Sequence, residues 1–478
     1  MFLTKVKISN YRSIDVIEFN IFPLNDGSCT YGLIGVNEAG KSTFLKALAL
    51  KEGLKDSRGR QLPLNIDFRD RSKPIEVIYY YDLSIAEVSE IMTLLTNVSN
   101  IGTISNDYFN SIIISVSFSY GAPSEIKIEL NLVNIPDENP HKTEIQKALF
   151  GHIYSNSHKT IFWTAEDRYL ISQPVNLNQF ATDPESTSIP LKNCFALAGI
   201  SGTEQIKIAL SSINDSTERE HLQNRLGETV TQHINKAWPQ HKIKITFNVS
   251  DGLINFHVHD SDIPVKAKTA DQRSDGFRQF ISFLLTVSAQ RENNELTKTI
   301  LLLDEPETHL HPQAQEELLK ELIKISEFEK QNIVFFATHS NYMIDKVNLG
   351  RNYKVQKIKD MTNVAPLPQK TSSYSEVTYE VFDICSTDYH NELYSRLNEI
   401  YISGNIGGKD TNKQQNFDDD FFRDDKKLKQ DKPFKKTPNK VTLPTYVRNC
   451  IHHPEGGNKY SPIELKRSIN LMRSYLSS

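Results

Sequence analysis

The alternation of apolar and polar residues predicts several strands in this chain. Residues 2–11 and 14–21 alternate between the two kinds of side chain, which is the pattern of a strand with one buried face. Residues 31–34, 300–303 and 333–336 are continuous apolar runs, as in strands that are covered on both faces of a parallel sheet. The pattern therefore favours an α/β fold, with a mixed sheet and helices.

Residues 83–264 lie between these apolar runs and mix both kinds of element. Residues 111–120 alternate as a strand does, whereas residues 143–154 have helical spacing. Asp251-Gly252 separates two alternating stretches and favours a tight hairpin turn. No heptad pattern is sustained, which argues against a long coiled coil. We expect a compact inserted α+β lobe.

Residues 346–478 are predicted to form a helical C-terminal region. Apolar residues recur at helical spacing between positions 389 and 397, and the Ser-Pro-Ile-Glu sequence at 461–464 is typical of a helix start. Residues 404–440 are rich in glycine, lysine and aspartate, so we expect a flexible linker there.

Composition narrows the class of protein. A chain of 478 residues is expected to form two or three domains. The net charge of −4 gives no overall positive field that would attract nucleic acid. There is no apolar run of transmembrane length and no signal-peptide core, so we expect a cytoplasmic protein without a membrane partner. Four widely separated cysteines argue against a disulfide framework or a zinc site: Cys29, Cys194, Cys385 and Cys450.

A phosphate-binding loop follows the first apolar run. Residues 35–42 read G-x-x-x-x-G-K-S and stand between a predicted strand and a predicted helix. Glycines let successive backbone N–H groups point at phosphate oxygens, and the helix N-terminus adds a positive dipole. Lys41 is placed to reach the β- and γ-phosphates, and the Ser42 hydroxyl to bind Mg²⁺. The candidate ATP-binding residues are Gly35, Asn37, Gly40, Lys41, Ser42 and Thr43.

Polar residues also follow the two later apolar runs. Asp304 is placed to hold Mg²⁺ together with Ser42, and Glu305 to polarise the water that attacks the γ-phosphate. His339 follows the next run and could contact the γ-phosphate or that water. Taken alone, Asp304-Glu305 could simply be a helix start, and His339 could belong to a helix-capping turn. Ligands bind beyond the carboxyl ends of parallel strands, so Gly35, Asp304 and His339 are expected to converge.

These motifs resemble the ABC-type ATPases of the SMC, RecF and OLD group over residues 1–82 and 265–345. The resemblance implies that Ser274 and Gly276, in RSDGFRQF, form a signature motif that contacts ATP bound to a partner head. It further implies that Arg12 and Ser13 lie near the nucleotide, that residues 309–311 cross a dimer interface, and that the heads dimerise head-to-tail or form larger oligomers.

Two departures from the pattern of these ATPases predict a protein that binds ATP better than it hydrolyses it. The family carries a glutamine in a region where this chain offers only Asp67 or Asp70. The second glycine of the signature motif is replaced by Phe277. We therefore expect a slow or regulatory ATPase.

The region from YEVFDI and YHNELY, at residues 379–394, to RNCIHHPE, at residues 448–455, resembles PtuA, the ATPase family of the Septu anti-phage system. That resemblance implies a separately encoded HNH nuclease as partner. An alternative is a terminal ribonuclease similar to HEPN proteins, since Arg448 and His453 are spaced R-x-x-x-x-H. Another is an OLD- or RecF-like DNA repair ATPase, although no Toprim nuclease pattern follows His339. The basic residues 432–440 could contact DNA or RNA, or form a solvated tail.

Overall fold

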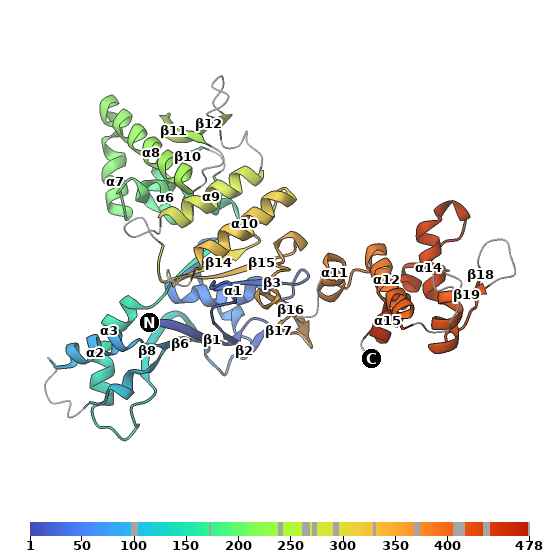
Figure 1. The fold of residues 1–478 in the computed structure, drawn as a ribbon. Coiled ribbons are helices and arrows are strands. Elements are labelled where there is room, and N and C mark those ends of the chain that lie inside the picture. Colours follow the sequence, from blue (N-terminus) through green and yellow to red (C-terminus); the bar gives the residue numbers. More distant parts are fainter. Residues whose placement is uncertain are drawn as a thin grey trace. The chain divides into compact units, whose positions relative to one another are not determined.

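The computed structural model describes eleven ranges of the chain (Figure 1): residues 1–96, 104–171, 174–237, 242–260, 268–269, 275–289, 296–327, 331–367, 373–404, 416–433 and 440–476. The chain forms two compact units, residues 1–369 and residues 370–478. None of the described helices is both long and apolar enough to cross a membrane.

The first unit contains a six-stranded sheet that carries the nucleotide motifs. Four of its five strand pairings are parallel, and the hairpin at one edge is antiparallel. In sheet order the strands are β17 (Met361–Pro366), β16 (Asn352–Ile358), β3 (Thr30–Ile34), β15 (Ile333–Thr338), β14 (Thr299–Asp304) and β9 (Lys159–Thr164). Every residue of β3, β14 and β15 is buried, which confirms the strands expected from the apolar runs.

A second, antiparallel sheet of the same unit is built from the alternating stretches. In sheet order its strands are β2 (Ile14–Asn20), β1 (Phe2–Tyr11), β6 (Ile75–Asp82), β7 (Ser111–Ser119) and β8 (Ala122–Leu132). Helices α2 (Ile85–Thr96) and α3 (Lys142–Asn156) contact each other, and α3 packs on β8. Helix α1 (Lys41–Ala49) contacts strands of both sheets and lies between them (Figure 1).

A helical lobe with a small sheet occupies the middle of the chain and is drawn in green in Figure 1. Its helices are α4 (Leu177–Thr182), α5 (Pro184–Thr187), α6 (Ile189–Leu197), α7 (Thr203–Ser211) and α8 (Ser216–Ala237). Its strands are β10 (Val175–Asn176), β11 (Ile243–Ser250), β12 (Leu253–Asp260) and β13 (Lys268–Thr269). The expected turn joins β11 to β12: Asp251 and Gly252 both have positive φ, as tight hairpins require.

The structure divides the chain differently from the boundaries expected at residues 83, 265 and 346. Strands β7 and β8 belong to the N-terminal sheet, β9 is the edge strand beside β14, and β16 pairs with β3. Three parts of the chain therefore complete the two sheets of the head, and only the segment after β9 forms a separate lobe. Strand partners are chosen by tertiary packing, so local patterns did not reveal these pairings.

Two further helices of the first unit lie before and after β14 in the chain. Helix α9 (Asp275–Ala289) contacts α6 and α8 of the lobe, and α10 (Pro312–Ile325) follows β14. A short hairpin is formed by β4 (Leu54–Lys55) and β5 (Gln61–Leu62).

The second unit is helical, as expected, and has its own apolar core. Its elements are α11 (Tyr374–Phe382), α12 (Thr387–Ser403), the π-helix η10 (Phe417–Asp425), β18 (Lys432–Pro433), β19 (Lys440–Val441), α14 (Leu443–His452) and α15 (Pro462–Leu476). Ser461 and Glu464 make the reciprocal hydrogen bonds of a capping box before α15.

The segment at 404–440 differs from the flexible linker that its composition suggested. Phe417, Phe421 and Phe422 are buried in the core of the second unit, and the fully buried Asp418 accepts hydrogen bonds from Thr442. Residues 405–415 and 434–439, which include most of the basic stretch, lie outside the described residues.

Candidate functional site

The phosphate loop connects β3 to α1, as the sequence predicted, and its glycines are required by close packing. A Cβ atom on Gly35 would lie 2.2 Å from the carbonyl oxygen of Val355. Gly40 has a φ of +107°, and a Cβ atom there would lie 2.0 Å from Oγ1 of Thr362. The β16–β17 hairpin therefore presses against the loop at both glycines, and larger residues would clash with it.

Lys41 folds back onto its own loop. Its Nζ donates hydrogen bonds to the carbonyl oxygens of Gly35 and Val36, at 2.9 and 3.1 Å. It also lies 2.9 Å from Nε2 of His339, at the end of β15. Burial lowers the pKa of Lys41 to about 8, and the nearby charge of Glu305 partly opposes this shift. Asn37 is exposed and Thr43 is half-buried.

Ser42 and Asp304 form a direct pair between α1 and the end of β14. The Ser42 hydroxyl donates to Oδ1 of Asp304 at 2.8 Å. Burial raises the pKa of Asp304, and the hydrogen bond from Ser42 opposes that shift. A carboxylate and a hydroxyl are the hard oxygen ligands that Mg²⁺ prefers. Among the described residues, no group of three or more His, Cys, Asp or Glu is placed to hold a metal ion.

Glu305 and His339 meet at the carboxyl ends of β14 and β15. Oε1 of Glu305 lies 2.7 Å from Nε2 of His339, and this hydrogen bond lowers the pKa of Glu305. Glu305 has a φ of 53°, the left-handed conformation, and its backbone N–H donates to Ala337 O at 3.0 Å. The side chains of Glu305 and His339 are 40% and 30% exposed, so both can be reached from solvent.

The turn at Arg12 and Ser13 reaches the phosphate loop through a residue that sequence reasoning missed. The Ser13 hydroxyl lies 2.8 Å from Oγ1 of Thr362, which in turn donates to the carbonyl oxygen of Ala39 at 3.3 Å. Thr362 lies in β17, in the region expected to be outside the head. No local signal distinguishes it, because its position depends on the pairing of β16 with β3.

Asp67 and Asp70, the weak substitutes for the family's glutamine, bond to other parts of the protein. Oδ1 of Asp67 accepts a hydrogen bond from Nε of Arg12 at 2.8 Å. Asp70 accepts one from the Ser72 hydroxyl at 2.7 Å. Strand β9 ends beside the end of β14, because Thr164 pairs in register with Asp304.

The signature motif is only partly described. Ser274 lies outside the described residues, and Gly276 lies in the first turn of α9. Further along this helix, Arg278 Nε donates to Ile171 O at 2.9 Å, and the Ser282 hydroxyl accepts from Ile171 N at 2.8 Å. Helix α9 is thus attached to the chain that continues from β9.

Residues 309–311 lead into α10 and are tied to the end of β15. Nδ1 of His311 accepts a hydrogen bond from Gln313 N at the start of α10. Gln315 donates to Leu310 O at 2.8 Å and accepts a hydrogen bond from Ser340. Gln315 was not singled out in the sequence, since a polar residue in a helix carries no signal of such a role.

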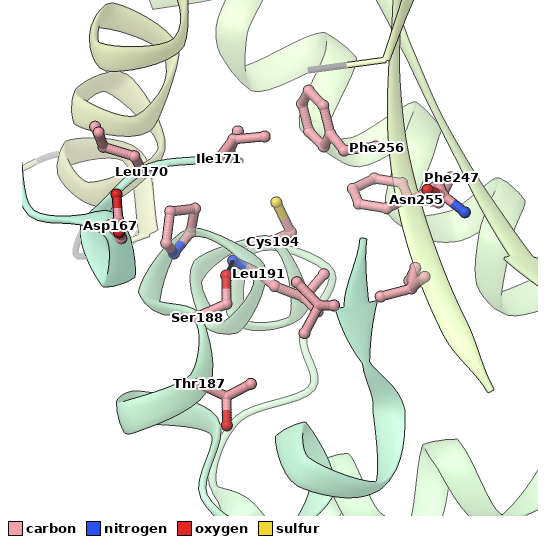
Figure 2. Close-up of a pocket in the computed structure, with 13 residues that line it drawn as sticks. Asp167, Leu170, Ile171, Thr187, Ser188, Leu191, Cys194, Phe247, Asn255 and Phe256 are labelled. Carbon is pink, nitrogen blue, oxygen red and sulfur yellow. Dashed lines mark hydrogen bonds between the residues drawn. The ribbon is translucent and has the colours of Figure 1, made fainter. Parts of the chain in front are cut away.

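A separate pocket lies in the middle lobe (Figure 2). Phe247 and Phe256 from β11 and β12 face α6, which contributes Leu191 and Cys194. Its lining is mainly apolar and includes none of the candidate nucleotide residues. The concentration of charged and hydrogen-bonding groups at the phosphate loop, rather than this pocket, marks the candidate functional site.

Three solved SMC heads of low sequence identity resemble this chain. An Smc head bound to the C-terminal winged-helix domain of ScpA is 13% identical, with a TM-score of 0.45 over 77% of this chain and 98% of that chain. A Pyrococcus furiosus Smc head with an extended coiled coil is 12% identical, with a TM-score of 0.42 over 77% and 96%. The SMC head of Thermotoga maritima is 10% identical, with a TM-score of 0.38 over 77% and 100%.

Sequence comparison gives a partial relative and a family. An uncharacterized protein of Methanocaldococcus jannaschii is 28% identical over 123 residues, which is 25% of this chain and 31% of that protein. The chain therefore spans about a third of the length of this relative. The family described as an AAA ATPase domain matches residues 1–344, from β1 to the end of the segment that contains His339. With its phosphate loop, Asp304 and Glu305 gathered at one sheet edge, this chain belongs to the AAA ATPase domain family.

Proposed function

We propose that this ATPase works in a prokaryotic anti-phage defence system, where it dimerises head-to-tail and scaffolds or regulates a separately encoded HNH nuclease. The observation that carries the ATPase part is the convergence of Lys41, the Ser42–Asp304 pair and the Glu305–His339 pair. The defence role is supported by the resemblance of the C-terminal region to the PtuA family.

In this proposal every residue of the site has a defined role. Lys41 and the loop N–H groups bind the phosphates, and Ser42 and Asp304 hold Mg²⁺, which would neutralise phosphate charge. Glu305 is ionised at neutral pH, and the hydrogen bond from His339 lowers its pKa further, so its carboxylate is available to polarise and orient the attacking water. His339 orients Glu305 and contacts the γ-phosphate.

A second head would close the site over the γ-phosphate. This step is supported by the exposure of Glu305 and His339, which leaves the reacting side of the site open to solvent. Water must be excluded for the charged groups to act strongly. Ser274 and Gly276 of a second copy are the proposed closing residues, as the family resemblance implies.

Sequencing of the neighbouring genes, followed by coexpression with any HNH protein that they encode, tests the defence proposal. We expect a stable complex whose nuclease activity changes when ATP is replaced by ADP. A neighbouring locus without an HNH reading frame, together with a chain that degrades nucleic acid alone, would contradict the proposal.

A terminal ribonuclease is the second candidate function, and one observation favours it. Arg448 lies in α14, and His452 and His453 stand at the C-terminal end of that helix. Burial lowers the pKa of His452, and the charges of Arg448 and His453 add to the shift. A histidine with a lowered pKa beside the guanidinium of Arg448 suits proton transfer near a phosphate.

A further inference from the structure

We propose that Glu307 is the positioning residue of this ATPase: its buried carboxylate holds the end of β15 so that His339 reaches Glu305. The inference rests on the roles proposed above for Glu305 and His339. Glu307 follows Asp304 in the sequence DEPE, and the sequence pattern did not indicate a function for it.

One oxygen of Glu307 makes all of its described side-chain hydrogen bonds. Oε1 accepts from the hydroxyl of Thr338 and, at 3.2 Å, from the backbone N–H of His339. The Thr338 hydroxyl in turn accepts from Ser340 N at 2.9 Å. A single acceptor atom thus fixes the three residues at which the chain leaves β15.

The backbone around Glu307 fixes the other member of the pair. The carbonyl oxygen of Glu305 accepts hydrogen bonds from the N–H and the hydroxyl of Thr308, at 3.3 and 2.9 Å. The N–H of Leu310 donates to Glu307 O at 3.0 Å. Glu307 therefore sits within the turn that holds Glu305 in its left-handed conformation, and its side chain ties that turn to His339.

Burial shows that Glu307 acts through other residues rather than on the nucleotide. Glu307 is 5% exposed, whereas the side chain of Glu305 is 40% exposed. Its second oxygen, Oε2, has no hydrogen-bond partner within the described part of the chain. Burial also raises the pKa of Glu307. The geometry thus requires one acceptor oxygen at this position and does not require a negative charge.

Because Oε1 of Glu307 accepts both hydrogen bonds, variants that keep or remove this acceptor should differ clearly in activity. Glu307→Gln keeps an acceptor at Oε1, so kcat is expected to stay within about twofold of the native value. Glu307→Ala removes both hydrogen bonds to Oε1, and Thr338→Val removes the one donated by the hydroxyl. Each variant is expected to lower kcat by about ten- to a hundredfold with KM nearly unchanged. Thr338→Ser keeps the hydroxyl, so its kcat should stay close to the native value. Glu317→Gln, on the exposed face of α10, is the control.

Thermal unfolding separates positioning from a loss of fold. If Glu307→Ala lowers Tm but leaves the kcat of the folded protein unchanged, the inference is wrong. A loss of kcat in Glu307→Gln as large as that in Glu307→Ala would also overturn it, since charge rather than position would then matter. If Lys41→Ala and Glu305→Gln leave ATP turnover unchanged, the proposed site itself fails, which is a distinguishable result.

Discussion

Lys41 and His339 touch across the phosphate loop, with Nζ of the lysine 2.9 Å from Nε2 of the histidine. The same ammonium group is bonded to two carbonyl oxygens of its own loop. Phosphate must therefore compete with these partners for Lys41. Because His339 also contacts Glu305, movement of Lys41 would change the surroundings of Glu305, the residue proposed to activate water.

Lys41→Ala is expected to weaken ATP binding by at least about a hundredfold, since charge-assisted contacts to the phosphates are lost in a buried site. Isothermal titration calorimetry with ATP and Mg²⁺ measures this. Lys320→Ala, on the exposed face of α10, should bind as the native protein does. Native affinity in Lys41→Ala would show that the loop does not bind the nucleotide through this lysine.

Glu305→Gln should retain bound ATP and accumulate as a dimer. The amide cannot accept the proton of the attacking water, whereas the Ser42–Asp304 pair remains intact. Light scattering with ATP and Mg²⁺ should show the mass of two chains, and with ADP the mass of one. A single-chain mass under both conditions would contradict head-to-tail closure.

The stability of the first unit should fall as the pH drops from about 6.5 toward 3, and His158 should account for part of the loss. Burial lowers its pKa to about 3, and its ring nitrogen bonds to Gln331 O at 2.8 Å. The unfolded chain therefore binds a proton near pH 6.5 that the folded protein does not, which costs up to about 1.4 kcal/mol per pH unit.

Urea unfolding followed by tryptophan fluorescence measures this loss at pH 6.5 and pH 5. His158→Gln should flatten the dependence, and His152→Gln, at a partly exposed position, should not. An unchanged slope in His158→Gln would show that His158 does not contribute.

Changing Arg448 and His453 to alanine together should leave the nuclease activity of the full complex intact, because the HNH partner is proposed to perform cleavage. Degradation of a labelled RNA by the isolated chain, compared with the double variant, checks this. Arg467→Ala, on an exposed position of α15, is the surface control. RNA cleavage that disappears only in the double variant would favour the ribonuclease alternative.

Sequence patterns predicted the elements that are encoded locally. The strands at 31–34, 300–303 and 333–336, the phosphate loop and the capping box at Ser461 follow from short runs of residues. Parallel strands align their carboxyl ends, so the approach of Ser42 to Asp304 could also be anticipated.

Features that depend on distant pairing could not be predicted in the same way. Thr362 touches the phosphate loop only because β16 pairs with β3, some 320 residues earlier in the chain. The aspartate-rich sequence around Phe417 suggested a solvated linker, yet its aromatic residues fill a core. Glu307 reaches Thr338 because β14 and β15 are neighbours in the sheet, a pairing that the local sequence does not encode.

The position of β3 has a consequence for synthesis on the ribosome. Its two neighbours, β15 and β16, are encoded about 300 residues later. At typical elongation rates the nascent chain carries this buried strand unpaired for roughly 15 to 60 seconds. The phosphate loop, although almost the first motif to be translated, is therefore among the last to mature, and a prematurely released fragment would expose an aggregation-prone strand instead of a nucleotide site.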